Sequence, residues 1–331
     1  MNRRKFVVVS TVLMFAVAGL IAGLTYYSSA VAEAAIGRLP AAVRYFPADS
    51  QAVVGINVRA FLSSPFYAAA QARRGAVVGS ELNEFIEKTG VDPRTDIDYI
   101  VAGGRALAGG KGNGALIAIG RFNEEKISSF IRSKSVPMEV NYGNAVVLMI
   151  PEQSGTQLEK GIAFLDQGEL ALGDLESLKA ILDVRAGKAG VKSNQTLVQM
   201  LDELDPDAMF WFAGDAANIM SKAPVDSPLG DKLSAIQTIF GTLDLGSVVT
   251  GQLTATALSE ESATQLAAVV NGLVALGSLA STQNPEMSVL KDLVSGITIM
   301  QDGNKVHLKV SFSAELLDKL EQAKMDRRKV I

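Results

Sequence analysis

The sequence predicts an α+β fold, in which two similar units of antiparallel sheet with interleaved helices follow one N-terminal transmembrane helix. The first observation is a run of 19 uncharged, mostly apolar residues at 6–24. The second is a series of short apolar segments joined in pairs by turns that contain Gly and Asn, a pattern typical of antiparallel hairpins. The third is the alternation of these pairs with stretches whose apolar residues recur at helical spacing.

The N-terminal run has the length and flanks of a membrane anchor. A helix rises about 1.5 Å per residue, so roughly 20 apolar residues cross a hydrocarbon core of about 30 Å. Arg3, Arg4 and Lys5 precede the run, and Tyr26 and Tyr27 follow it where interfacial aromatic residues belong. Because positively charged flanks stay in the cytoplasm, we expect a cytoplasmic N-terminus and an extracytoplasmic globule on the inner (cytoplasmic) membrane.

A cleaved signal peptide is the alternative interpretation. Ala30-Val31-Ala32 matches an A-x-A cleavage site, and cleavage after Ala32 would release a secreted protein. The apolar run is longer than the roughly 7–15 residues of a typical signal peptide, which favours the uncleaved anchor. Attachment of a lipid to the N-terminus would need a cysteine, and the chain has none.

Composition excludes several functional classes. The net charge is −4 at pH 7 and becomes −7 without the three basic residues that precede the anchor, so nucleic acid is not an expected partner. No cysteine and one histidine leave no thiolate nucleophile, thiolate zinc site or iron–sulfur cluster, and we expect no cofactor and no metal. The 48% hydrophobic content is sufficient for packed cores rather than disorder.

The predicted organisation has four parts. Residues 1–28 form the anchor, 29–38 a spacer, 39–188 the first α+β unit and 189–331 the second. In the first unit the patterns predict strands at 51–58, 97–102 and 115–122, hairpins at 139–150 and 161–172, and helices at 64–72, 80–89, 123–134 and 175–185.

The second half shows a similar order of patterns, which suggests an internal duplication. It predicts a strand at 247–258, a long helix from Ser259 to about Ala280, a hairpin at 296–313 and a terminal helix at 314–323. Two pairs of segments support the duplication: 204–212 parallels 45–53 as a Pro-containing turn that leads into an apolar strand, and 303–308 parallels 143–148.

The Gly-rich segment 103–114 does not match a phosphate-binding loop. A P-loop requires G-x-x-x-x-G-K-[ST], but Gly110 separates Gly109 from Lys111, and Gly112 stands where the hydroxyl residue belongs. A dinucleotide fingerprint also fails, because a strand follows the segment instead of a helix. We therefore predict a flexible hairpin connection.

The remaining polar features predict solvated surfaces. His307 alternates with Val306 and Leu308 and belongs to the polar face of its strand. The acidic residues between positions 202 and 207 lack the glycine-containing pattern of a calcium loop. The uncharged segment 263–281 is diluted by polar residues and predicts a packed core helix rather than a second membrane span.

One motif resembles a known group of proteins. Tyr45-Phe46-Pro47-Ala48-Asp49, followed by the apolar strand 52–58 and by Phe61-Leu62, resembles the start of the globular part in uncharacterised bacterial envelope proteins with a single N-terminal anchor. The resemblance covers about 20 residues and implies an extracytoplasmic, membrane-tethered protein. It implies no activity and no site residues.

These observations predict a non-enzymatic binding or scaffolding module of the cell envelope. Its partners are the membrane, through residues 6–24, and an unidentified envelope protein or lipid; no catalytic, cofactor-binding or metal-binding residue is predicted. Two alternatives stay open. One is a periplasmic carrier of an apolar ligand or lipid, lined by the helix at 263–281 and by Trp211. The other is a hydrolase that uses carboxylates such as Asp96 and Asp98.

N-terminal sequencing of the mature protein tests the anchor. We expect an N-terminus upstream of residue 6 and retention in the membrane fraction after alkaline extraction, because the apolar run is long enough to span the bilayer. A mature chain that starts at Glu33 would show that the segment is a cleaved signal peptide.

Overall fold

The computed structural model describes residues 39–74, 80–105, 113–151, 158–216, 234–283 and 288–316. The predicted anchor and spacer, most of the Gly-rich segment and most of the predicted terminal helix lie outside these residues. Within the described ranges, no helix combines the length and hydropathy that a membrane crossing requires.

The α+β class is confirmed, and contacts divide the chain into two compact units. Unit 1 comprises most of residues 39–206 together with 212–214, and unit 2 comprises 63–73, 207–211 and the chain from 215 onward. The strand β8 (Phe210–Asp215) contributes residues to both units.

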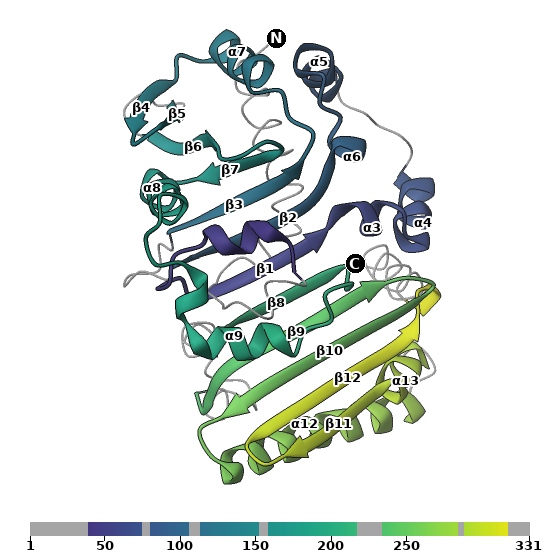
Figure 1. Cartoon of the computed structure of the whole chain (residues 1–331). Helices are drawn as coiled ribbons and strands as arrows, with labels where there is room; N and C mark the ends of the chain where they lie inside the picture. The colour runs from purple at the N-terminus through teal and green to yellow at the C-terminus, as the bar shows by residue number, and fades with distance from the viewer. Residues whose placement is uncertain are drawn as a thin grey trace. The chain divides into compact units, whose positions relative to one another are not determined.

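Unit 1 contains a seven-stranded antiparallel sheet with the strand order β1-β2-β3-β7-β6-β5-β4 (Figure 1). Its strands are β1 (Ala52–Asn57), β2 (Ile97–Arg105), β3 (Asn113–Gly120), β4 (Met138–Tyr142), β5 (Ala145–Pro151), β6 (Leu158–Phe164) and β7 (Glu169–Gly173). Its helices are η1 (Ala41–Tyr45), α3 (Val58–Leu62), α5 (Ser80–Thr89), α6 (Pro93–Asp96), α7 (Glu124–Lys134), α8 (Leu175–Arg185), η2 (Val191–Ser193) and α9 (Gln195–Asp202).

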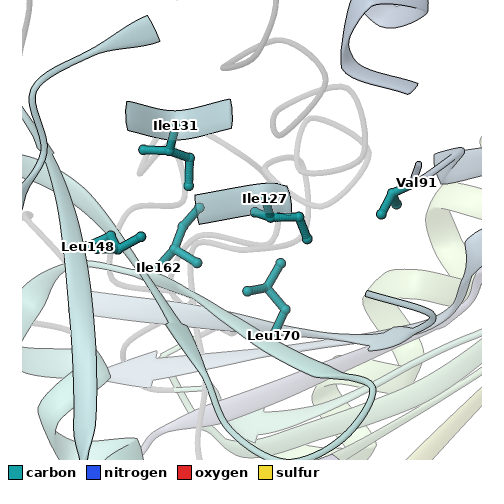
Figure 2. Close-up of a cluster of buried hydrophobic side chains, with 6 residues drawn as sticks. All are labelled: Val91, Ile127, Ile131, Leu148, Ile162 and Leu170. Atoms are coloured by element: carbon teal, nitrogen blue, oxygen red, sulfur yellow. The ribbon is translucent and has the colours of Figure 1, made fainter. Parts of the chain in front are cut away.

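Both faces of this sheet are covered by helices. Leu148 of β5 packs in a buried cluster with Ile127 and Ile131 of α7 (Figure 2). Successive strand side chains point to opposite faces, so Val147 and Met149 point away from α7. On that second face α8 comes so close that a Cβ at Gly161 would lie 3.0 Å from Leu178 Cδ1. The sheet therefore lies between α7 and α8.

Capping side chains define the starts of these two helices. Asn123 Oδ1 accepts a hydrogen bond from the Lys126 amide at 2.9 Å, and Asp174 Oδ1 accepts one from the Ser177 amide at the same distance. These bonds satisfy amides that have no partner in the first helical turn. The Asp174 Oδ2 atom also accepts from the Gly114 amide at 2.9 Å, which attaches the start of α8 to β3.

Unit 2 contains a four-stranded antiparallel sheet in the order β11-β12-β10-β9. Two helices lie along one face of these strands (Figure 1). The elements are α4 (Pro65–Arg74, of which Arg74 groups with unit 1), β9 (Ile236–Leu245), β10 (Val248–Ala257), α12 (Glu260–Gln283), α13 (Ser288–Ser295), β11 (Ile297–Asp302) and β12 (Lys305–Ser313).

Two Gly-Asn turns were correctly predicted from the sequence. Gly143 and Gly303 begin the turns of the β4–β5 and β11–β12 hairpins and have φ of +57° and +52°, a backbone region that glycine adopts without a Cβ penalty. The two hairpins nevertheless occupy different places in their sheets, because β5 pairs with β6 whereas β12 pairs with β10.

The sequence did not predict β9, α9 or α13. Gly241 and Asp244 interrupt the apolar pattern of β9 and are weak strand formers, which explains the omission. Helix α9 follows residues 187–193, whose polar sequence predicts a linker. Contacts place this stretch with unit 1: the Val191 amide donates to the Phe46 carbonyl at 2.8 Å, and Asn194 Nδ2 donates to the Ala48 carbonyl at 3.4 Å.

A pair of glycine substitutions tests the packing of the Phe46 ring. A Cβ at Gly103 would lie 2.6 Å from Cδ1 of this ring, which is 1% exposed. We expect Gly103→Ala to destabilise the protein by about 1–3 kcal/mol through overpacking. Gly272→Ala, in open space on α12, should stabilise it by about 0.5–1 kcal/mol through higher helix propensity. Urea unfolding of both variants and of the parent chain checks these opposite changes in the free energy of unfolding. Unfolding midpoints equal to that of the parent chain would contradict them.

Candidate functional site

A cleft of about 430 Å³ lies in unit 1 where four segments meet. These are the end of α5, the end of β3, the first turn of α7 and the β6–β7 turn. The cleft is lined by Thr89, Gly90, Val91, Gly120, Arg121, Phe122, Asn123, Lys126, Gln167 and Gly168.

Local hydrogen bonds hold each wall of the cleft in place. The Thr89 hydroxyl donates to the Phe85 carbonyl at 2.6 Å and accepts from the Val91 amide at 3.1 Å, so it closes the end of α5. The Gly120 amide donates to the Gly168 carbonyl at 2.8 Å, which attaches the β6–β7 turn to β3. The walls are therefore set by backbone and capping interactions.

Arg121 is positioned by carboxylates outside the cleft. Its Nη2 and Nε atoms donate to Asp96 Oδ1 at 2.9 and 3.1 Å, and Nη2 also bonds the Thr95 carbonyl. Asp96 Oδ2 accepts from the Asp92 amide at 2.7 Å, so the acceptor is held from its other side. The positive charge of Arg121 is consequently neutralised at the rim.

Lys126 is the second cation of the lining and differs from Arg121. It is exposed on α7 and forms no ion pair with any residue that the structure describes. Its ammonium lies near α5, 3.6 Å from where a Cβ of Gly90 would lie. An unpaired ammonium at the mouth of a cleft favours a ligand with an anionic or strongly polar group.

The lining of the cleft offers two cationic side chains, two side-chain amides and a few apolar groups. Its ten lining residues include no serine, histidine, cysteine or carboxylate, and the Thr89 hydroxyl is engaged in closing α5. A nucleophile with an adjacent base, or a pair of carboxylates, is what hydrolysis requires. Across the described residues, no group of three or more potential ligands could hold a metal ion.

The two carboxylates considered for a hydrolase, Asp96 and Asp98, both form ion pairs with arginines. Asp96 binds Arg121 as described, and Asp98 forms an ion pair with Arg59, with Arg121 Nη1 3.9 Å from Asp98 Oδ1. The result is an alternating chain of two arginines and two aspartates on the surface.

The other sequence-predicted features lie apart from the cleft. His307 is half-buried on β12, and its Nδ1 is 3.0 Å from Thr254 Oγ1 on the neighbouring strand. Asp202, Glu203, Asp205 and Asp207 are all exposed, as expected for a solvated cluster. The Gly-rich segment connects β2 to β3, which pair as the predicted hairpin up to Arg105 and Asn113. Trp211, considered for a ligand cavity, is 1% exposed.

Sequence reasoning missed a polar cluster around Tyr45. The Tyr45 hydroxyl donates to Asp166 Oδ2, and Arg185 Nη2 binds Asp166 Oδ1 at 3.0 Å. Arg44 lies 3.8 Å from the same carboxylate and donates to the Tyr45 oxygen at 2.8 Å. Tyr45 and Asp166 are 121 residues apart, so no local pattern could have paired them.

This cluster shifts the pKa values of its members in opposite directions. Burial raises the pKa of the Tyr45 phenol well above its ordinary value, and the Asp166 and Glu169 carboxylates raise it further. The hydrogen bond from Tyr45 lowers the pKa of the Asp166 carboxyl, and the charges of Arg185 and Arg44 add to that effect. Because the cluster joins η1 to the β6–β7 turn and to the end of α8, its role is structural.

Comparisons with known proteins leave the family open. No family model matches the chain, and no curated protein matches it. Two solved structures, crystal forms I and IV of TP0453, are similar at 7% sequence identity, with TM-scores of 0.47 and 0.46. They cover 85% and 82% of this chain and 96% and 92% of their own. Similarity at this level supports no conclusion about function.

The Asp166 cluster predicts a specific dependence of stability on pH. A carboxylate whose pKa is lowered by folding stabilises the native state above its unfolded pKa of about 3.9, and this contribution disappears as the pH falls through the folded pKa. We expect Asp166→Asn to lower the free energy of unfolding at pH 7 by up to about 1 kcal/mol, the range for exposed ion pairs.

At pH values below the folded pKa the variant and the parent chain should unfold at the same urea concentration. Asp202→Asn is the matched control, since Asp202 is exposed and forms no ion pair among the described residues. A difference for Asp166→Asn that is as large at pH 2.5 as at pH 7 would contradict the role of the ionised carboxylate.

Proposed function

We propose that this protein is a single-pass, membrane-anchored binding or scaffolding module of the cell envelope, with its globule outside the cytoplasm and no catalytic activity of its own. The uncharged run at 6–24 behind three basic residues carries the proposal, since it is long enough to span a bilayer and sets the orientation. The globule that follows offers a cleft suited to binding.

The cleft beside Lys126 is the contact site that we propose for the partner. Three properties support it: its concave form, the mixed polar and apolar character of its lining, and an ammonium group without an ion pair among the described residues. The rim cation Arg121 is already paired with Asp96, so Lys126 supplies the charge available to a partner.

We further infer that the two units derive from one repeated arrangement, in a different alignment from that suggested by the sequence. In unit 1 the hairpin β2–β3 is followed by α7, and the last strand of the later hairpin β6–β7 pairs with β3. In unit 2 the hairpin β9–β10 is followed by α12, and the last strand of β11–β12 pairs with β10. The hairpin β4–β5 is then an insertion in unit 1.

Site-specific photocrosslinking in intact cells tests the proposed contact. A photoreactive residue at Gln167, which is exposed on the cleft lining, should give one adduct of constant mass. Lys126→Ala should weaken this adduct about tenfold, because loss of a charged contact worth roughly 1.4 kcal/mol changes affinity by that factor.

The control positions make the outcome specific. A photoreactive residue at Lys309, exposed on β12 of unit 2, should give no such adduct. Identical products from Gln167 and Lys309, or a Gln167 adduct that survives Lys126→Ala unchanged, would remove the cleft as the contact site. An adduct with lipid in place of protein would favour the carrier alternative.

A further inference from the structure

Helix α12 is buried against the sheet of unit 2 only along part of its length. Ala263, Leu266 and Ala267 are at most 8% exposed, and Gln301 of β11 donates to Thr264 Oγ1 at 2.9 Å. After Ala267, the described side chains of α12 up to Leu279 are all half-buried or exposed. The second half of the helix therefore presents much of its surface outward.

That outward surface carries leucines. Leu273, Leu276 and Leu279 are 38%, 64% and 55% exposed. Residues three apart on a helix are about 60° apart around its axis, so the three side chains share one side. A Cβ placed at Gly272 on the same stretch would meet no atom within 4 Å, so no residue that the structure describes covers this surface at that point.

The same helix lacks the charges that a solvated face normally carries. No charged residue occurs from 262 to 285, although one residue in five of the whole chain is charged. Exposed helix faces in water are normally rich in charged and polar side chains. An uncharged face with exposed leucines can bury apolar area against another apolar surface. Because the face carries no charge, it offers no electrostatic attraction to a highly charged partner.

The proposed anchor would hold the globule close to one apolar surface, the lipid bilayer. If residues 6–24 are the anchor, only residues 25–38 separate the membrane from the globule, a tether of at most about 50 Å when fully extended. Such a tether gives a weak contact a high effective concentration. Helix α12 is not long and apolar enough to cross the membrane, so a contact with lipid would place it in the interface.

We propose that the outward face of α12, formed by Leu273, Leu276 and Leu279, rests in the surface of the membrane that holds the anchor. This inference depends on the proposed anchoring and adds to it a second, reversible lipid contact. Because the face is uncharged and the protein is acidic, the contact depends on apolar burial and needs no anionic lipid.

Cysteine labelling of the full chain tests the contact, since the chain contains no cysteine of its own. Leu276→Cys is labelled with a fluorophore, and the chain is reconstituted into phosphatidylcholine vesicles that contain nitroxide-labelled lipid. Ser311→Cys is the matched control, because it is exposed on β12 and lies on the sheet face opposite α12, as alternation from Val306 requires.

We expect nitroxide lipid to quench the label at position 276 at least twofold more than the label at 311, and aqueous iodide to show the reverse order. With the label at Leu273→Cys, the added pair Leu276→Glu and Leu279→Glu should abolish the lipid quenching and leave the circular dichroism spectrum unchanged. Equal quenching at 276 and 311 would overturn the proposal. Shielding of position 276 from both quenchers would also overturn it, and would indicate that a second copy of the chain covers the face.

Flotation of the same vesicles separates this inference from the proposed function. If the chain floats with the vesicles and position 276 is open to iodide, the anchor stands and the contact of α12 with lipid does not. If the chain stays at the bottom of the gradient and its label is not quenched by lipid, both fail.

Discussion

The sheet of unit 1 has to be covered on both faces, and the position of the cleft follows from this constraint. Its inner strands are apolar at successive positions, so an uncovered face would leave a large apolar surface in water. Helix α7 covers one face through Ile127 and Ile131, and α8 covers the other through Leu178. The alternation of side chains along β5 is what separates these two cores.

The cleft lies beside the start of α7, the helix that covers the first face of the sheet. Helix α7 begins at Glu124, after its N-cap Asn123 and a short connection from β3, and α5 ends at Thr89 beside it. A side chain caps each of these helix ends: Asn123 Oδ1 accepts from the Lys126 amide, and the Thr89 hydroxyl donates to the Phe85 carbonyl. The Lys126 side chain lies at the cleft because it belongs to the first turn of α7. The candidate site is therefore a consequence of how the helices cover the sheet.

Unit 2 is covered differently. Helices α12 and α13 lie along one face of its four strands, and the polar residues of β12 occupy the opposite face. On the helical side, α12 buries its first turns and leaves three leucines exposed further along. Because only part of α12 packs on the sheet, the rest of the helix keeps apolar side chains available for another contact. Helix α7 differs, because its apolar residues Ile127 and Ile131 are buried against the sheet.

The sequence by itself determined the α+β class, the hairpins with their Gly-Asn turns, the helical segments 123–134 and 175–185, and the absence of thiol chemistry. These features depend on neighbouring residues, on period and on composition, which are all readable along the chain. The sequence did not predict β9, because Gly241 and Asp244 weaken its local pattern and only pairing with β10 along its length stabilises it as a strand. Only the tertiary structure placed the Tyr45 hydroxyl against the Asp166 carboxylate and paired Asp96 and Asp98 with arginines. It also left Lys126 without an ion pair among the described residues. These arrangements join residues far apart in the sequence, and their contacts exist only after the strands have paired and the helices have packed.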